Sequence, residues 1–505
     1  MGHFAEALAL VLRIDVGVTI LLSAIFGLFV GSVPGLTATM SVALLVPITF
    51  FLDPVPAVAA IATASATAIF AGDIPGALLR IPGTPASAAY VDEAHALTKK
   101  GQSEVALGTS LITASLGGLI GVLLLAVFAQ QLAAVAVKFS SVEYFWLGCL
   151  GLTAAVAVSS ASLSRGALSL LIGLLISTVG IDIATGHPRF TFGQMNLLDG
   201  VSFVPAMIGM FALSQVIRSV TTDLDVKVPV AKIGSLSRQM VGTVRTYWPN
   251  IIRSSVLGNI LGALPGAGAD IAAWVAFSLS KRFSKTPEKF GTGHPEGIAD
   301  AGAANNAAVA GAWTPALVFG IPGDTVTAIA IGVMMLKGIT PSPRVFETDG
   351  TLVLAIFMAF ALANLIMIPL GIIAIRVARH ALSVPTRILM PVILIFCIVG
   401  SYAVDNTIFS VWIMLGLGIL AYLMEENGIP IAPAILGIVL GKVIEKNFLI
   451  TMLKTQGDML GFFDRPVAAV LGVVTLALWS FLILRAIRSA AASRKVQSHT
   501  APAVK

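Results

Sequence analysis

Long runs that hold no Asp, Glu, Lys, Arg or His constrain this chain more than any other feature. A helix needs about 20 apolar residues to cross a hydrocarbon core about 30 Å thick, and several runs reach that length. Only 11% of the 505 residues are charged, against roughly a quarter in soluble domains. We therefore expect a polytopic membrane protein, whose charge-free runs are 16–52, 54–72, 105–137, 301–323, 351–375, 406–424 and 466–484.

Shorter apolar stretches raise the expected total to about 11 to 14 membrane elements, some of them half-crossings. The sequence thus predicts an all-α fold. Residues 1–15 carry neither a basic region nor a small-residue cleavage site, so we expect the first hydrophobic segment to be retained. The shorter stretches are 144–164, 166–180, 201–217, 254–269, 388–404 and 429–440.

Basic residues lie between and after the hydrophobic runs, so the net charge of +6 indicates membrane topology and not nucleic-acid binding. The tail after the last run is basic and holds no acid, which predicts a cytoplasmic C-terminus. We expect a first transmembrane repeat at 1–217, a cytoplasmic linker at 218–253, a second repeat at 254–449, a C-terminal loop and last helix at 450–490, and a basic cytoplasmic tail at 491–505.

Two pairs of short motifs indicate that the halves are related. Residues 31–38 (GSVPGLTA) match 262–269 (GALPGAGA), and 81–84 (IPGT) match 321–324 (IPGD). The polar insert 281–296 absorbs the difference between the two offsets. The alternative is that these are ordinary loop turns, since short Gly and Pro matches arise by chance in a Gly-rich chain. Duplicated halves are common in transporters, and we favour inverted over parallel repeats.

The run 16–52 would be about 55 Å long as a single helix, and Pro34-Gly35 interrupts it near the middle. Broken backbone at membrane depth is tolerated only where it is buried in protein or lines a cavity. A helix that restarts after such a break presents free N–H groups that suit a carboxylate. The candidate substrate-binding residues at the four breaks are Pro34, Gly35, Leu36, Thr37, Thr39, Pro82, Gly83, Thr84, Ser87, Pro265, Gly266, Gly268, Pro322, Gly323 and Thr325.

The second half carries Asp270 and Asp324 where the first has threonines, which suggests a coupling cation beside an anionic substrate. Helix capping is the alternative role for both carboxylates. Asn305 and Asn306 lie in an apolar, small-residue segment, where amides bind Na⁺ or substrate or else join packed helices. The candidate cation-coupling residues are Asp270, Asn305, Asn306 and Asp324, with Na⁺ considered at the first three.

Other polar residues carry less specific signals. Asp73 and Arg80 flank the first IPG motif, where Arg80 either binds a substrate carboxylate, pairs with Asp73 or reaches toward the lipid surface. The stretch 92–95 and the pair His294 and Glu296 lack zinc-ligand spacing, so we interpret both as solvated loops. Because the chain has no Walker A motif and no G-x-S-x-G, we expect no enzyme and no cofactor, and energy from a Na⁺ or H⁺ gradient or another subunit.

With these motifs in order, the chain resembles the large membrane subunit of the tripartite tricarboxylate transporters, from about residue 15 to about residue 450. The resemblance implies import of a small di- or tricarboxylate such as citrate across a bacterial inner membrane, coupled to Na⁺ or H⁺. It also implies a periplasmic solute-binding protein and a small membrane subunit as partners, and inverted repeats with re-entrant hairpins in membrane lipid. The motifs are 31–40, 45–50, 81–87, 262–269, 305–308 and 320–324.

The chain departs from the family pattern at four places, so its substrate need not be citrate. Gly72-Asp73-Ile74 stands where Gly-Gly-Ser is usual, and the others are at 92–95, 302–304 and 341–343. A stand-alone carboxylate symporter is the main alternative function. A membrane-embedded enzyme or scaffold is less favoured because no polar catalytic cluster is visible.

Overall fold

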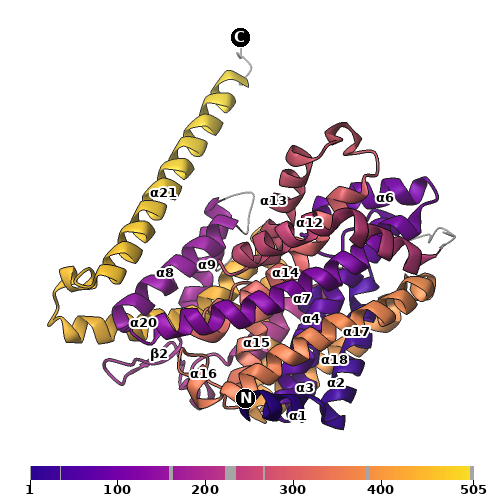
Figure 1. Cartoon of the computed structure of the whole chain (residues 1–505). Helices are drawn as coiled ribbons and strands as arrows, with labels where there is room; N and C mark the ends of the chain where they lie inside the picture. The colour runs from indigo at the N-terminus through magenta and orange to yellow at the C-terminus, as the bar shows by residue number, and fades with distance from the viewer. Residues whose placement is uncertain are drawn as a thin grey trace. The chain divides into compact units, whose positions relative to one another are not determined.

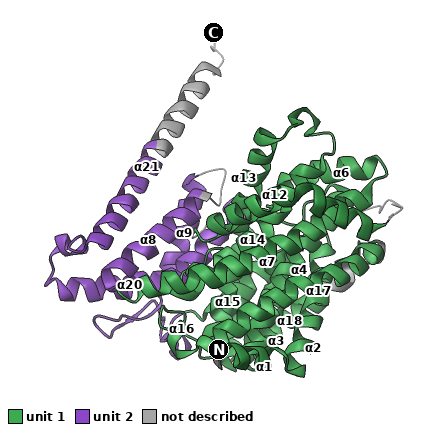
Figure 2. Cartoon of the chain, viewed as in Figure 1, with its two compact units in different colours: residues 1–138, 201–423 green, residues 139–200, 424–505 purple. Residues whose placement is uncertain are grey.

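The computed structural model describes residues 2–34, 36–158, 163–221, 235–264, 268–382 and 386–500 (Figure 1). Most of this is helical, and a short hairpin pairs β1 (Gly180–Ile181) antiparallel with β2 (Pro188–Arg189). The chain forms two compact units (Figure 2): unit 1 combines Met1–Lys138 with Val201–Leu423, and unit 2 combines Phe139–Gly200 with Met424–Lys505.

The helices, in chain order, are α1 (Gly2–Val11), α2 (Ile14–Ser32), α3 (Ala38–Thr49), α4 (Pro54–Ala71), α5 (Asp73–Leu79), η1 (Ser87–Ala89), α6 (Val91–Lys99), α7 (Ser103–Ala136), α8 (Ser141–Val158), α9 (Leu163–Ser177), η2 (Met195–Leu197), α10 (Phe203–Met207), the π-helical η3 (Ile208–Leu213), α11 (Ser214–Thr221), α12 (Leu236–Gly262), α13 (Gly268–Phe283), η4 (Pro287–Lys289), α14 (Pro295–Phe319), α15 (Thr325–Leu336), α16 (Val345–Thr348), α17 (Gly350–Leu382), α18 (Thr386–Asp405), α19 (Ile408–Glu426), α20 (Ala432–Lys454), η5 (Met459–Phe462) and α21 (Pro466–Thr500).

The expected all-α polytopic membrane fold is confirmed. In the described part of the chain, five helices are long and apolar enough to cross a membrane: Ile14–Ser32, Pro54–Leu79, Ser103–Ala136, Gly350–Ala378 and Ile408–Glu426. Shorter apolar helices accompany them at Ala38–Thr49, Ser141–Ala157, Leu163–Ser177, Phe203–Ser219, Thr325–Leu336, Met390–Asp405 and Pro466–Leu482.

The first long run is a discontinuous helix, as predicted. Helix α2 ends at Ser32, the chain turns at Pro34, and α3 begins at Ala38. Thr37 caps α3, because its Oγ1 accepts a hydrogen bond of 3.2 Å from the backbone N–H of Met40. Three residues of the predicted breaks, Gly35, Pro265 and Gly266, lie outside the described residues.

The segment 218–253, predicted as a linker, is helical over much of its length. Helix α11 continues to Thr221 and α12 begins at Leu236, while 222–234 lie outside the described residues. Backbone angles leave the helical region at Tyr247, two residues before Pro249. A proline inside a helix removes a donor and clashes with the preceding turn, which accounts for a kink there.

The matched motifs correspond to matched contacts between helices. A Cβ added to Gly31 of α2 would collide with the backbone of Ala68 in α4, and one added to Gly262 of α12 would collide with Ala308 in α14. The separation of Gly31 from Gly262 equals that of the first motif pair, and the separation of Ala68 from Ala308 equals that of the second. Small residues allow helix backbones to approach this closely. The repeat is therefore a duplicated packing arrangement and not a chance likeness between loops; the same offsets relate Gly27 and Ala64 to Gly258 and Ala304.

The second motif also repeats its backbone geometry. Arg80 ends α5 with a left-handed φ of 61°, and Gly320 ends α14 with a φ of 65°. In both, the next residue turns its N–H back to a proline carbonyl, from Ile81 at 3.4 Å and from Ile321 at 3.3 Å. A non-glycine residue in this conformation is strained, so Arg80 is held there by its surroundings.

Small residues fill the centre of unit 1. Helix α4 is buried from Val55 to its end at Ala71, and α14 buries every residue from Gly297 to Val318. Helices α7 and α12 pack against α14, and α2 packs against α4. The two central segments, α4–α5 and α14, are equivalent in the repeat. They position the motifs that follow them.

Candidate functional site

A hydrogen bond joins the first turns of two helices from opposite halves of the repeat. The Oγ1 atoms of Thr39, at the start of α3, and Thr325, at the start of α15, lie 2.9 Å apart. Both residues are half-buried. The first break of one half therefore meets the second break of the other.

A related contact joins the other two breaks. The carboxylate of Asp270, in the first turn of α13, lies near the backbone N–H of Ala86. Trp274, one turn later, donates its Nε1–H to the carbonyl of Pro85 at 3.3 Å. The repeat relates Asp270 to Thr39 and Pro85 to Thr325, so the two cross-contacts join equivalent regions of the repeat.

Reciprocal caps hold the loops after both IPG motifs. Thr84 and Ser87 each accept the other's backbone N–H at 3.1 Å. In the second half, Asp324 Oδ1 accepts the N–H of Thr327 at 2.7 Å, and Thr327 Oγ1 accepts the N–H of Asp324 at 3.0 Å. This is a capping box at the start of α15. Helix capping, the alternative considered for Asp324, accounts for one of its carboxylate oxygens.

The breaks bring carboxylates and helix N-termini close together. A Cβ added to Gly268, the first residue of α13, would lie 3.0 Å from the Cβ of Asp324. Asp270 and Asp324 are near enough to interact electrostatically. Helices α3, α13 and α15, of 12, 16 and 12 residues, all begin here. Free N–H groups and Thr hydroxyls suit an anion, while the two carboxylates suit a cation.

Sequence comparisons identify the family to which this arrangement belongs. The sequence profile of the Tripartite tricarboxylate transporter TctA family matches residues 18–436. The chain belongs to that family. Two relatives come from Agrobacterium vitis. An uncharacterized 52.8 kDa protein of the TAR-I ttuC' 3' region is 36% identical over 465 residues, which cover 92% of each chain.

The second relative, an uncharacterized protein of the TAR-II ttuC' 3' region, is 36% identical over 232 residues, which are 46% of this chain and 96% of the relative. No solved structure matches the chain. The TctA family is a family of transporters, and the polytopic helical fold agrees with that membership.

Among the candidate substrate-binding residues of this TctA-family chain, burial separates two groups. Thr37, Thr39 and Thr325 are half-buried and Pro82 is exposed, so they are open to a ligand. The other described candidates are buried, and Thr84 and Ser87 also use their hydroxyls in caps. These buried residues shape the breaks: Pro34, Leu36, Gly83, Thr84, Ser87, Gly268, Pro322 and Gly323.

The two asparagines lie in α14 and have little polar contact. Asn305 is 2% exposed, and neither of its amide atoms has a hydrogen-bond partner in the described structure. Asn306 donates to the carbonyl of Ala66 at 3.5 Å, and its Oδ1 has no partner. Neither amide makes a hydrogen bond to Asp270 in the described structure. A Na⁺ site shared by these three residues therefore remains a prediction.

Asp73 and Arg80 do not pair with each other, contrary to one interpretation of the sequence. Arg80 Nε donates to Asp92 at 2.8 Å on the surface, whereas Asp73 is buried and accepts hydrogen bonds from Tyr90 and Ser110. Arg80 forms the left-handed C-cap of α5, which carries its side chain away from Asp73.

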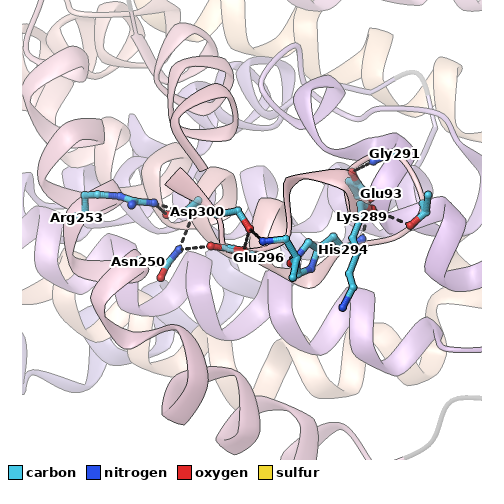
Figure 3. A network of polar contacts seen from close by, with 11 residues as sticks. Glu93, Asn250, Arg253, Lys289, Gly291, His294, Glu296 and Asp300 are labelled. Atoms are coloured by element: carbon cyan, nitrogen blue, oxygen red, sulfur yellow. Dashed lines mark hydrogen bonds and ion pairs between the residues drawn. The ribbon is translucent and has the colours of Figure 1, made fainter. Parts of the chain in front are cut away.

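The interpretation of 92–95 and the His294 region as solvated loops is wrong. Glu93 lies on α6 and is 1% exposed, and its carboxylate accepts the backbone N–H groups of Gly291, Gly293 and His294 (Figure 3). His294 in turn lies 3.5 Å from Glu296. A helix of the first half thus holds the polar insert of the second half. No local sequence signal predicts this contact, because its partners are about 200 residues apart.

Proposed function

We propose that this chain is the large transmembrane subunit of a tripartite secondary transporter that imports a small di- or tricarboxylate, citrate-like in chemistry. A periplasmic binding protein delivers the substrate, and Na⁺ or H⁺ drives its uptake. The observation that supports the proposal best is the meeting of helix N-termini from both halves, marked by the bond between Thr39 and Thr325.

The geometry suggests how substrate and ion depend on each other. Backbone N–H groups at the start of α3 and α15, with the hydroxyls of Thr39 and Thr325, bind the carboxylate groups. The carboxylates of Asp270 and Asp324 repel that anion until a cation neutralises them. Cation and substrate therefore bind cooperatively, and by linkage each raises the affinity of the other.

Family membership supports the proposed partners, and the charge pattern supports the proposed location. The binding protein and a small membrane subunit complete the transporter in a bacterial inner membrane. The basic tail after 484 faces the cytoplasm under the positive-inside rule. The chain itself carries substrate and ion and catalyses no covalent reaction.

The test is uptake of labelled citrate into proteoliposomes that contain this chain, the small subunit and the binding protein. We expect accumulation only when the binding protein and an ion gradient are present. Asp270→Asn and Asn305→Ala should abolish ion-driven uptake while leaving expression intact. Asp92→Asn, on the exposed surface, is the matched control. Wild-type uptake by both site variants refutes the site, and uptake by the chain alone indicates a stand-alone symporter.

Labelling of introduced cysteines tests the orientation of the repeats. The equivalent loops follow Lys99 and Leu336, and both native cysteines, Cys149 and Cys397, are buried and add little background. Inverted repeats place the two loops on opposite sides of the membrane. Labelling of both from the same side would indicate parallel repeats.

A further inference from the structure

Asp73 lies in the centre of unit 1, where ionised side chains are rare. It begins α5 directly after α4 and is 4% exposed. Tyr90 donates its hydroxyl to Oδ1 at 2.7 Å, and Ser110 of α7 donates its hydroxyl to Oδ2. Each carboxylate oxygen thus has one neutral donor.

No cation accompanies this carboxylate among the described residues. Arg80, on the same helix, pairs with Asp92, and His95 of α6 places Nδ1 3.1 Å from the carbonyl of Ala77. Glu93 binds backbone N–H groups of the second half. The other titratable residues with described side chains on helices packed against α5 are Lys99 of α6, Glu104 of α7, Asp15 of α2 and Arg376 of α17, and none of these interacts with Asp73.

A small cavity opens beside Asp73, with room for about one water molecule. Its polar lining consists of Asp73, Ser87, Tyr90 and Ser110, and the rest is glycine and apolar side chains. The Ser87 hydroxyl already donates to the carbonyl of Thr84. A space for about one water leaves little room for a metal ion together with its shell of oxygen ligands. A proton requires no such shell.

A second observation connects this cluster to α14. Asn305 lies beside the Tyr90 hydroxyl, but neither of its amide atoms makes a well-formed hydrogen bond in the described structure. While Asp73 is ionised, Tyr90 donates its proton to the carboxylate. Once Asp73 is neutral it attracts that proton less, and Tyr90 can donate to Asn305 Oδ1 instead. Asn305 Oδ1 therefore gains a hydrogen-bond donor when Asp73 carries a proton.

We propose that Asp73 binds and releases a coupling proton of this carrier, and that Tyr90 passes the change to Asn305. The step is the formation and breakage of one carboxyl O–H bond, with the proton taken from water on one side and released on the other. Helix α14 carries Asn305 and ends at Phe319, and the loop after it leads into the Asp324 cap, so proton and substrate act on one helix. The inference rests on the proposed function and specifies its ion.

Infrared difference spectroscopy tests the proton site without any substrate. A pH change applied to the purified full chain should produce the carbonyl band of a protonated carboxyl group. We expect Asp73→Asn to lose this band, Asp92→Asn to keep it, and Tyr90→Phe to keep it at a shifted frequency, because the hydrogen bond to the carboxyl group changes. An identical band in wild type and Asp73→Asn overturns the proposal.

Transport by the complete three-component system separates the two proposals. With the membrane potential held at zero, a pH difference of about one unit sustains about ten-fold accumulation per coupled proton. Asp73→Asn should lose this accumulation yet still exchange carboxylate across vesicles at equal pH. Proton-driven accumulation in Asp73→Asn, or wild-type accumulation driven only by Na⁺, overturns the inference. Absence of any carboxylate exchange by wild type refutes the proposed function, while the infrared band still tests Asp73.

Discussion

Asp300 and Asp73 are both buried carboxylates in unit 1, but their partners differ in kind. Asp300, 0% exposed on α14, accepts from Arg253 at 2.9 Å, from Asn250 at 2.9 Å and from Ser254 (Figure 3). Asp73 accepts only from two hydroxyls in the described structure. A guanidinium fixes a carboxylate in its ionised form, whereas hydroxyls support either form. The first arrangement suits structure and the second suits proton exchange.

Glu93 stands between these two cases. It is as buried as Asp300, yet its partners among the described residues are the backbone N–H groups of three residues and no side-chain cation. Backbone donors favour the ionised form but carry no net charge. The three carboxylates therefore form a series in which the effect of substitution on stability should fall from Asp300 to Glu93 to Asp73.

Removal of the cation beside Asp300 should have the largest effect. Arg253→Ala leaves a buried charge that keeps only Asn250 and Ser254, and we expect the free energy of unfolding to fall by about 3 kcal/mol. Thermal unfolding in detergent measures this loss. Arg245→Ala, exposed on the same helix, is the control. Equal stability of both variants would show that Arg253 does not stabilise Asp300.

Glu93→Gln should cost less, about 2 kcal/mol, since charge-assisted hydrogen bonds to backbone donors weaken while the side-chain shape is kept. The loss should be local. Hydrogen exchange should accelerate at the amides of residues 291, 293 and 294, and Asp92→Asn on the same helix should leave them unchanged. Unchanged exchange in Glu93→Gln would mean that the insert is held by other contacts.

Asp73→Asn should leave stability within about 1 kcal/mol of wild type, because a buried carboxylate without a cation gains little from its charge. The same thermal unfolding assay measures the change. This small cost, set against the loss of proton coupling, is what distinguishes the site from the Asp300 network. A loss as large as that of Arg253→Ala would assign Asp73 a structural role.

Arg80→Gly should have the smallest effect. The substitution removes an exposed ion pair, whose partners are 61% and 66% exposed, and at the same time relieves a left-handed backbone conformation. Each contribution is below about 1 kcal/mol and they oppose each other. The midpoint of thermal unfolding should stay near that of wild type. A clearly lower midpoint would show that the Arg80 side chain makes stabilising contacts besides its ion pair with Asp92.

The sequence by itself determined the elements and their duplication. Charge-free runs set the membrane helices, since lipid excludes unpaired backbone groups and ionised side chains. Pro34 broke the first run because it lacks an N–H donor. The two motif pairs marked the repeat, because Gly31 and Gly262 each meet a helix backbone that admits no side chain. These are local constraints, and local constraints can be recognised along the chain.

Only the tertiary structure decided which side chains meet. Thr39 and Thr325 are 286 residues apart, and Glu93 lies 200 residues from Gly293. The sequence around Asp73 does not distinguish whether the carboxylate pairs with Arg80 or with Tyr90. Such pairings depend on how helices from the two halves cross, and a crossing is set by the packing of many small side chains together. The chemistry of a buried carboxylate follows from that packing, because its neighbours decide whether it stays charged.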